Sequence, residues 1–158
     1  MLFIDASVIV AILLREDDAE ALYDRLIDNG GPYRVSPIVR IEASLSIARA
    51  MAANQKPSAP ATRQTIERAQ MAVDAFIEAI GATDVSITSS IGTKAIESAG
   101  RFGKIVGHPA RLNMGDCLAY ACAKGYRAGL AFKGDDFPHT DLGWDGITSS
   151  HPRPKGAH

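Results

Sequence analysis

Acidic residues stand at four separated places in this sequence where the neighbouring residues predict burial. Each one follows a short apolar run or falls within an expected helix: Asp5, Glu42, Asp116 and Asp135, with Asp136 beside the last. Aspartate and glutamate are rarely buried without a partner, and the flanking sequence offers none of them its own lysine or arginine. Mg²⁺ and Mn²⁺ take hard oxygen ligands and would supply that positive charge. The pattern therefore predicts a divalent-cation site.

Taken singly, each of these residues also has a structural explanation. Asp5 could cap a helix and Glu42 could be a solvated helix residue. Asp116 could satisfy the dipole of a helix that Asn113 caps, and the pair at 135 and 136 could form a surface turn. If the four groups converge, however, like charges raise one another's pKa and cannot all stay ionised unaided. Their joint occurrence in this order is harder to attribute to turns and caps.

The elements that would position these residues alternate between strands and helices. We expect strands at 2–4, 33–36, 83–87 and 128–132, an edge strand near 146–147, and helices at 8–14, 17–27, 38–53, 62–80, 89–99 and 114–124. This alternation predicts an α/β fold with a mostly parallel sheet and helices on both faces. We expect one domain over residues 1–148 and a disordered tail over 149–158.

Two finer expectations concern the helices that would carry the first acids. Ser7 is the expected N-cap of the first helix, because serine readily accepts a hydrogen bond from the first turn. In helix 38–53 the expected buried face is spaced by three and four residues and comprises Ile38, Ile41, Leu45, Ala48 and Ala52. Glu42 would then lie at the edge of that face.

Composition narrows the classes of protein without choosing one. The chain has 158 residues, 46% of them hydrophobic, and a formal net charge of −1. That charge argues against a nonspecific nucleic-acid binder with a basic stripe, but it leaves a metal-dependent nuclease open. The apolar opening, residues 2–14, lacks a basic leader and a cleavage site, and no run spans a bilayer, so we expect a cytoplasmic protein without membrane association. Cys117 and Cys122 are expected to be reduced core residues.

Four segments together resemble a known family. They are Asp5-Ala6-Ser7 after a strand, residues 37–42 ending in Glu42, residues 108–116 ending in Asn113-Met114-Gly115-Asp116, and Phe132-Lys133-Gly134-Asp135-Asp136-Phe137 followed by Thr140-Asp141. Over roughly residues 1–148 the sequence resembles PIN-domain ribonucleases, specifically the VapC-type toxins of bacterial type II toxin–antitoxin pairs. The resemblance implies a three-layer α/β/α sandwich and a Mg²⁺- or Mn²⁺-dependent endoribonuclease that hydrolyses RNA phosphodiester bonds.

The resemblance also assigns roles to individual residues. It implies that four carboxylates serve both as metal ligands and in catalysis: Asp5, Glu42, Asp116 and Asp135. It gives supporting positions to Ser7, which helps to orient a water, and to Asn113 and Asp136. Sequence does not decide which of the two adjacent aspartates faces the metal, and we favour Asp135. The implied partners are an RNA substrate and a cognate VapB-type antitoxin that covers the acidic pocket, and a homodimer is expected.

Three other classes of protein are alternatives to this interpretation. A haloacid-dehalogenase-type phosphatase needs an aspartate two residues after its nucleophile, where this chain has Ser7. A response-regulator receiver needs an aspartate at the end of its third strand, and residues 85–90 contain none. The stronger alternative is a catalytically weak protein of the same fold that binds RNA or an antitoxin.

Overall fold

A parallel sheet of four short strands forms the centre of the molecule. The computed structural model describes residues 1–147. The strands are β1 (Leu2–Ile4), β2 (Tyr33–Val35), β3 (Thr83–Asp84) and β4 (Gly129–Ala131), in the order β3-β2-β1-β4. Every neighbouring pair is parallel. The predicted parallel sheet is confirmed, although the third strand is shorter than expected.

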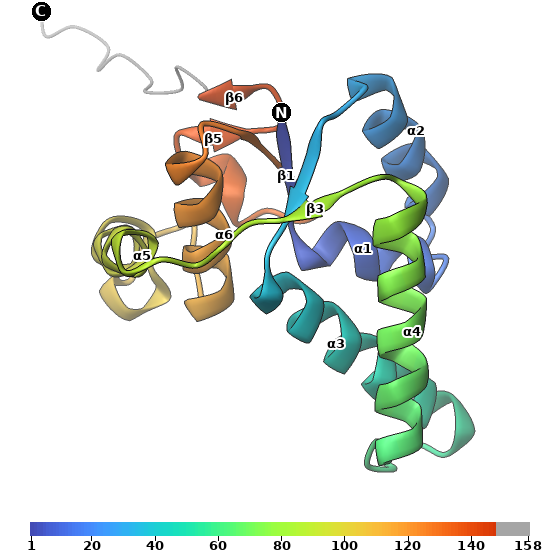
Figure 1. The fold of residues 1–158 in the computed structure, drawn as a ribbon. Helices are drawn as coiled ribbons and strands as arrows, with labels where there is room; N and C mark the ends of the chain where they lie inside the picture. Colours follow the sequence, from blue (N-terminus) through green and yellow to red (C-terminus); the bar gives the residue numbers. More distant parts are fainter. Residues whose placement is uncertain (148–158) are drawn as a thin grey trace, which may run out of the picture.

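Six α-helices flank this sheet. They are α1 (Ala6–Leu13), α2 (Ala19–Asn29), α3 (Pro37–Gln55), α4 (Arg63–Ala79), α5 (Ser89–Phe102) and α6 (Met114–Gly125). Figure 1 shows α5 and α6 on one side of the sheet and α1, α2 and α4 on the other, with α3 and α4 packed as a hairpin. The three-layer α/β/α sandwich expected from the sequence is confirmed. No helix within residues 1–147 has the length and apolarity to cross a membrane.

Short elements complete the described chain. The 3₁₀ helices η1 (Lys104–Val106) and η2 (Phe137–His139) follow α5 and β4, and β5 (Leu142–Gly143) pairs antiparallel with β6 (Gly146–Ile147). The expected edge strand is thus half of a separate two-stranded ribbon. The expected tail, residues 149–158, lies outside the described residues.

The direction in which the chain adds strands to the sheet reverses beside β1. From β1 the chain adds β2 and β3 on one side, and then returns through α5 and α6 to place β4 on the other side of β1. The carboxyl ends of β1 and β4 therefore lie next to each other, and the Asp5 N–H donates to the Ala131 carbonyl at 2.9 Å. Open α/β sheets bind ligands in the crevice at such a reversal. The fold thus brings the residues that follow β1 and β4 to a natural binding edge.

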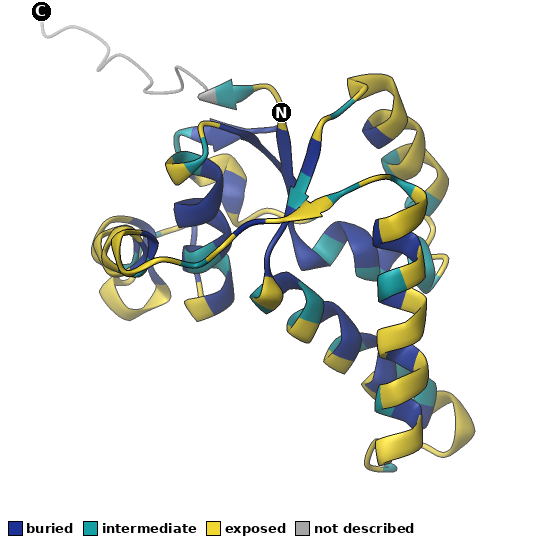
Figure 2. Cartoon of the chain, viewed as in Figure 1, coloured by how far each residue is buried: buried dark blue, intermediate teal, exposed yellow. Residues whose placement is uncertain are grey.

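The core lies between the sheet and the inner faces of the helices, as the buried residues in Figure 2 show. All three residues of β1 are inaccessible to solvent, and α6, which packs on β1 and β4, is buried along most of its length. Cys117 and Cys122 are buried there as free thiols, as predicted. The helix that carries Asp116 is therefore fixed against the central strands.

Helix α3 buries only part of the face predicted: Ala48 and Ala52 are buried as expected, but Ile41 and Leu45 are not. Ile41 and Leu45 are 52% and 44% exposed, whereas Val39, Ala43 and Ile47 are buried. Apolar residues occur around most of this helix, so their spacing alone does not select a face. The observed face is the one that α1 and α4 contact, and only the tertiary fold defines it.

Candidate active site

Asp5 stands at the end of β1 and caps helix α1. Its Oδ2 accepts hydrogen bonds from the Ser7 N–H at 2.9 Å and from the Ser7 Oγ–H at 2.5 Å. The expected N-cap, Ser7, is therefore wrong: Asp5 is the cap, because its extended backbone directs the carboxylate at the first turn. Burial raises the pKa of Asp5 and outweighs these hydrogen bonds, which favour the ionised form.

Asp116 lies in the first turn of α6 and is held by a reciprocal pair of hydrogen bonds. Asn113 Oδ1 accepts the Asp116 N–H at 3.0 Å, and Asp116 Oδ2 accepts the Asn113 N–H at 2.9 Å. This capping box fixes the direction of the carboxylate. Burial raises the pKa of Asp116 to about 6, the Asn113 hydrogen bond opposes that rise, and the charges of Asp5 and Asp136 add to it.

Glu42 reaches the same place from helix α3. Its carboxylate lies against the backbone of Gly115, where a Cβ atom would stand 1.8 Å from Glu42 Oε1. Only glycine permits this approach without displacement of Glu42. Burial raises the pKa of Glu42 to about 7, and the charges of Asp5 and Asp116 contribute further to the rise. These three side chains therefore form one acidic cluster at the carboxyl edge of the sheet, called the acidic pocket below.

The fourth acidic position is the loop that follows β4. Asp135 and Asp136 are both exposed. Asp136 is the loop carboxylate whose charge raises the pKa values of Asp5 and Asp116. The structure therefore favours Asp136 as the carboxylate nearer the pocket, and the preference for Asp135 is kept below as the alternative to be tested.

Two basic residues close in sequence to these acids, Arg40 and Lys133, are engaged elsewhere. Arg40 binds Asp84 through two hydrogen bonds of 2.9 and 2.7 Å and also pairs with Asp74. Lys133 pairs with Glu16 and Asp18. Among the described residues, no lysine or arginine contributes to the pKa of Asp5, Glu42 or Asp116. The pocket thus holds uncompensated negative charge.

The chemistry of this donor set fits a hard divalent cation. All its candidate ligands are carboxylate oxygens, which Mg²⁺ and Mn²⁺ prefer, and the like charges of Asp5 and Asp116 contribute to the raised pKa of Glu42. Within residues 1–147, however, no three Asp, Glu, His or Cys groups are close enough to enclose an ion as they stand. The residues fit the metal in type and in charge, and movement of Glu42 and of the loop after β4 would have to bring their oxygens to those of Asp5 and Asp116.

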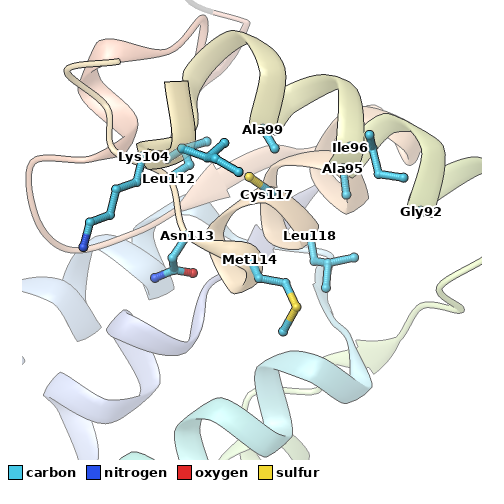
Figure 3. A pocket seen from close by; sticks show the side chains of 11 residues that line it. Gly92, Ala95, Ile96, Ala99, Lys104, Leu112, Asn113, Met114, Cys117 and Leu118 are labelled. Atoms are coloured by element: carbon cyan, nitrogen blue, oxygen red, sulfur yellow. The ribbon is translucent and has the colours of Figure 1, made fainter. Parts of the chain in front are cut away.

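An apolar groove of about 640 Å³ opens beside the pocket, between α5, η1 and α6. Figure 3 shows that Asn113 and Met114, at the start of α6, form one end of it. Three of its apolar side chains are largely exposed, Ile96 at 76%, Ile105 at 87% and Met114 at 77%. The groove and the acidic pocket thus share the first turn of α6.

Sequence reasoning found the acidic residues but not two others that hold the site together. Gly115 belongs to the Asn-Met-Gly-Asp motif, yet its contact with Glu42 depends on how α3 packs against α6. Lys133 belongs to the Lys-Gly-Asp-Asp motif, but its partners lie more than a hundred residues away in sequence. The motifs signalled both residues, and only the fold shows what they contact.

The fold agrees with a comparison to protein families. The PIN domain family matches residues 2–142, which is most of the chain. The chain therefore belongs to the PIN domain family.

Individual relatives narrow this assignment. VapC ribonuclease R02377 of Rhizobium meliloti (strain 1021) is 46% identical over 143 residues, which cover 90% of this chain and all of the relative. Ribonuclease VapC28 of Mycobacterium tuberculosis is 34% identical over 89% of this chain and 95% of its own. Within the PIN family the chain is thus of the VapC type.

A solved structure supports the fold independently. The crystal structure of Mycobacterium tuberculosis VapC20, described as a sarcin-ricin loop cleaving toxin, superposes with a TM-score of 0.62. The superposition covers 91% of this chain and 98% of the other, at 16% sequence identity. The architecture is therefore shared even where the sequences have diverged.

Proposed function

We propose that this chain is a Mg²⁺- or Mn²⁺-dependent endoribonuclease toxin that a cognate VapB-type antitoxin inhibits. The observation that carries the proposal is the meeting of Asp5, Glu42 and Asp116, without a basic partner, at the carboxyl edge of the sheet. When bound, a divalent ion would act there as a Lewis acid on the phosphodiester and lower the pKa of water. The names of the VapC ribonuclease relatives support RNA as the substrate.

In this proposal the protein's own residues hold and orient the acidic groups. Ser7 holds Asp5, and Asn113 holds Asp116, so two carboxylates have fixed directions before substrate binds. Glu42, with its pKa raised to about 7, can take up or release a proton near neutral pH. The loop after β4 supplies the fourth carboxylate. Residues held in this way reduce the reorganisation that the reaction requires.

Partners follow from the same charge distribution. An acidic pocket without its own counter-charge favours a partner segment that carries lysine or arginine, and we expect the antitoxin to cover the pocket.

A homodimer also belongs to the proposal. Light scattering at micromolar concentration checks it, and a uniformly monomeric protein would contradict it. We also propose a cytoplasmic location, because the proposed substrate, cellular RNA, is found there.

The direct test uses purified, antitoxin-free protein and labelled RNA. We expect cleavage with Mg²⁺ or Mn²⁺, none with EDTA, and a loss of at least about a hundredfold in Asp116→Asn and in Glu42→Gln, because each removes a charge that stabilises the transition state. Circular dichroism checks that both variants fold. Intact RNA after incubation with wild-type protein and either ion, together with retained binding of RNA or antitoxin, would instead favour the catalytically weak alternative.

A paired substitution decides the fourth carboxylate. If Asp136 faces the metal, Asp136→Asn loses most of the activity and Asp135→Asn retains most of it. The reverse result would restore the preference drawn from the sequence. Each variant is the matched control of the other, because both change one exposed aspartate in the same loop.

A further inference from the structure

The loop between β4 and η2 is tied to the acidic pocket through a single residue. The Lys133 N–H donates to Ser7 Oγ at 3.0 Å, and the Ser7 hydroxyl donates in turn to Asp5 Oδ2 at 2.5 Å. Ser7 therefore connects the backbone of this loop to the first carboxylate. With one donor and one acceptor contact already made, its hydroxyl acts here as a link between two chain segments.

The side chain of Lys133 makes a second anchor in another direction. Its ammonium pairs with Glu16 and, at 2.7 Å, with Asp18, both in the connection between α1 and α2. These two hydrogen bonds raise the pKa of Lys133 and favour its charged form. Lys133 thus binds the loop to the α1 side of the molecule through its backbone and through its side chain.

The rest of the loop has few constraints of its own. Gly134 has a φ of +105°, a conformation open mainly to glycine, and Asp135 and Asp136 are exposed. Fixed points flank them: the Trp144 indole N–H donates to the Phe132 carbonyl at 3.1 Å, and Phe137 is buried. Between these two points, Lys133 is the residue whose side chain is anchored to another element.

We propose that Lys133 is a positioning residue that, clamped by Ser7, Glu16 and Asp18, sets the place of Asp136 relative to Asp5 and Asp116. The inference rests on the proposed metal-dependent nuclease function. The hydrogen bonds from Lys133 to Ser7 and from Ser7 to Asp5 place the start of this loop beside the first carboxylate. Release of the clamp would let the loop, and the charge of Asp136 with it, move away from the pocket.

A direct contact between Lys133 and an RNA phosphate makes the opposite prediction. Neutralising Glu16 and Asp18 would free the lysine for RNA and strengthen substrate binding, because phosphate contacts depend on available positive charge. If the lysine instead positions the loop, the same change removes its anchor and weakens the site. The acidic partners therefore distinguish the two roles better than the lysine does.

The experiment compares Lys133→Met with the double variant Glu16→Gln/Asp18→Asn and with the triple variant. In both the single and the double variant we expect kcat for RNA cleavage to fall about tenfold or more. The affinity for Mn²⁺, measured by calorimetry without RNA, should fall in parallel, as it does when other residues that orient metal ligands are changed. KM should change less than about twofold. The triple variant should be no worse than either, because all act on one clamp.

Two controls make the result interpretable. Arg63→Met breaks the exposed Arg63–Glu67 pair on α4 and should leave kcat and Mn²⁺ affinity unchanged. Lys133→Arg keeps the charge and should retain most of the activity, and circular dichroism checks that Lys133→Met is folded.

Several outcomes would overturn the inference. Unchanged kcat and Mn²⁺ affinity in Lys133→Met would exclude a positioning role while leaving the nuclease proposal intact. A raised KM in Lys133→Met, with improved binding in the double variant, would identify an RNA contact instead. If wild-type protein cuts no RNA, the nuclease proposal fails, and the difference in Mn²⁺ affinity between wild type and Lys133→Met still tests the clamp.

Discussion

Two groups of carboxylates in this molecule have opposite surroundings. Burial disfavours the charge of Asp141, but hydrogen bonds from the Tyr120 hydroxyl at 2.6 Å and the Lys124 ammonium at 2.9 Å outweigh it and lower the pKa. In the acidic pocket, burial raises the pKa of Asp5, Glu42 and Asp116. Within residues 1–147 the fold thus provides a positively charged partner for Asp141 and only neutral hydrogen-bond partners for Asp5 and Asp116.

This contrast separates acids that hold the fold together from acids that are available to a ligand. Asp141 joins the end of the β4 region to α6 through Lys124, and Asp84 joins β3 to α3 through Arg40. The pocket carboxylates are held by neutral groups, Ser7 and Asn113, which orient them without cancelling their charge. Perturbed groups of this kind cluster at functional sites, although structural ion pairs also perturb pKa values.

The largest effect on activity should come from replacing the Asp5 carboxylate in the acidic pocket with an amide. Asp5→Asn keeps a capping side chain but removes a pocket charge, so we expect activity to fall at least about a hundredfold with little change in melting temperature. RNA cleavage and thermal melts on the same samples measure both quantities. Equal activity in Asp5→Asn and wild type would end the distinction between the two groups.

A methyl group at Gly115 should disturb the pocket without changing any charge. Gly115→Ala places a Cβ atom 1.8 Å from the present position of Glu42 Oε1, so Glu42 must move. Misplacement of this kind can cost about a hundredfold in rate. Activity should fall while circular dichroism stays unchanged. Gly92→Ala on α5, where a Cβ atom meets nothing within 4 Å, is the matched control and should retain full activity.

Asp141, which has a positively charged partner, should affect stability and leave activity unchanged. Asp141→Asn weakens the ion pair with Lys124, and we expect a loss of about 1–2 kcal/mol in the free energy of unfolding, as for hydrogen bonds to charged groups. Urea titration measures this change. Catalytic activity below the melting transition should remain near that of wild type, and a hundredfold loss of kcat in the folded variant would place Asp141 in the site.

The smallest effect is a difference in pH dependence. Folded Glu42, with a pKa of about 7, keeps a proton that the unfolded chain releases near its ordinary value of 4.5, so its contribution to stability declines as pH rises between these values. Glu42→Gln lacks this decline. Without divalent ions we expect the free energy of unfolding of Glu42→Gln to exceed that of wild type by roughly 1 kcal/mol at pH 8, after discounting for partial exposure. At pH 4 the difference should be small.

Paired carboxylates depend on pH with the opposite sign. The stabilisation from Asp141 is present above its ordinary pKa of 3.8 and is lost as pH falls through its lower folded value. Thermal melts of wild type, Asp141→Asn and Glu42→Gln across pH 3–8 compare the two. If the stability of Glu42→Gln relative to wild type does not increase between pH 4.5 and 7, ionisation of Glu42 does not destabilise the folded state.

The sequence predicted the placement of the site better than its detail. Apolar runs located β1 and β4, and because parallel strands present their carboxyl ends at one edge, the residues after them were expected to meet. Asn113 and Asp116 were recognisable as a helix start. These features depend on local sequence, which is why they could be read from it.

What the sequence could not supply depends on packing between distant elements. The buried face of α3 was predicted only in part, because apolar residues occur around most of that helix: Ala48 and Ala52 are buried as expected, whereas Ile41 and Leu45 are exposed. The contact of Glu42 with Gly115 and the pairing of Lys133 with Asp18 join segments far apart in the chain. No local pattern distinguishes Asp136 from Asp135, since both are exposed neighbours.

The most direct test of the central claim is a calorimetric titration of Mn²⁺ into the purified protein at pH 6.5, repeated in buffers of different ionisation enthalpy. We predict binding that releases up to about one proton, because Glu42 is largely protonated at this pH, and a loss of that binding in Asp5→Asn and Asp116→Asn. An absence of Mn²⁺ binding, or binding that both substitutions leave unchanged, would contradict the assignment of these carboxylates to a metal site.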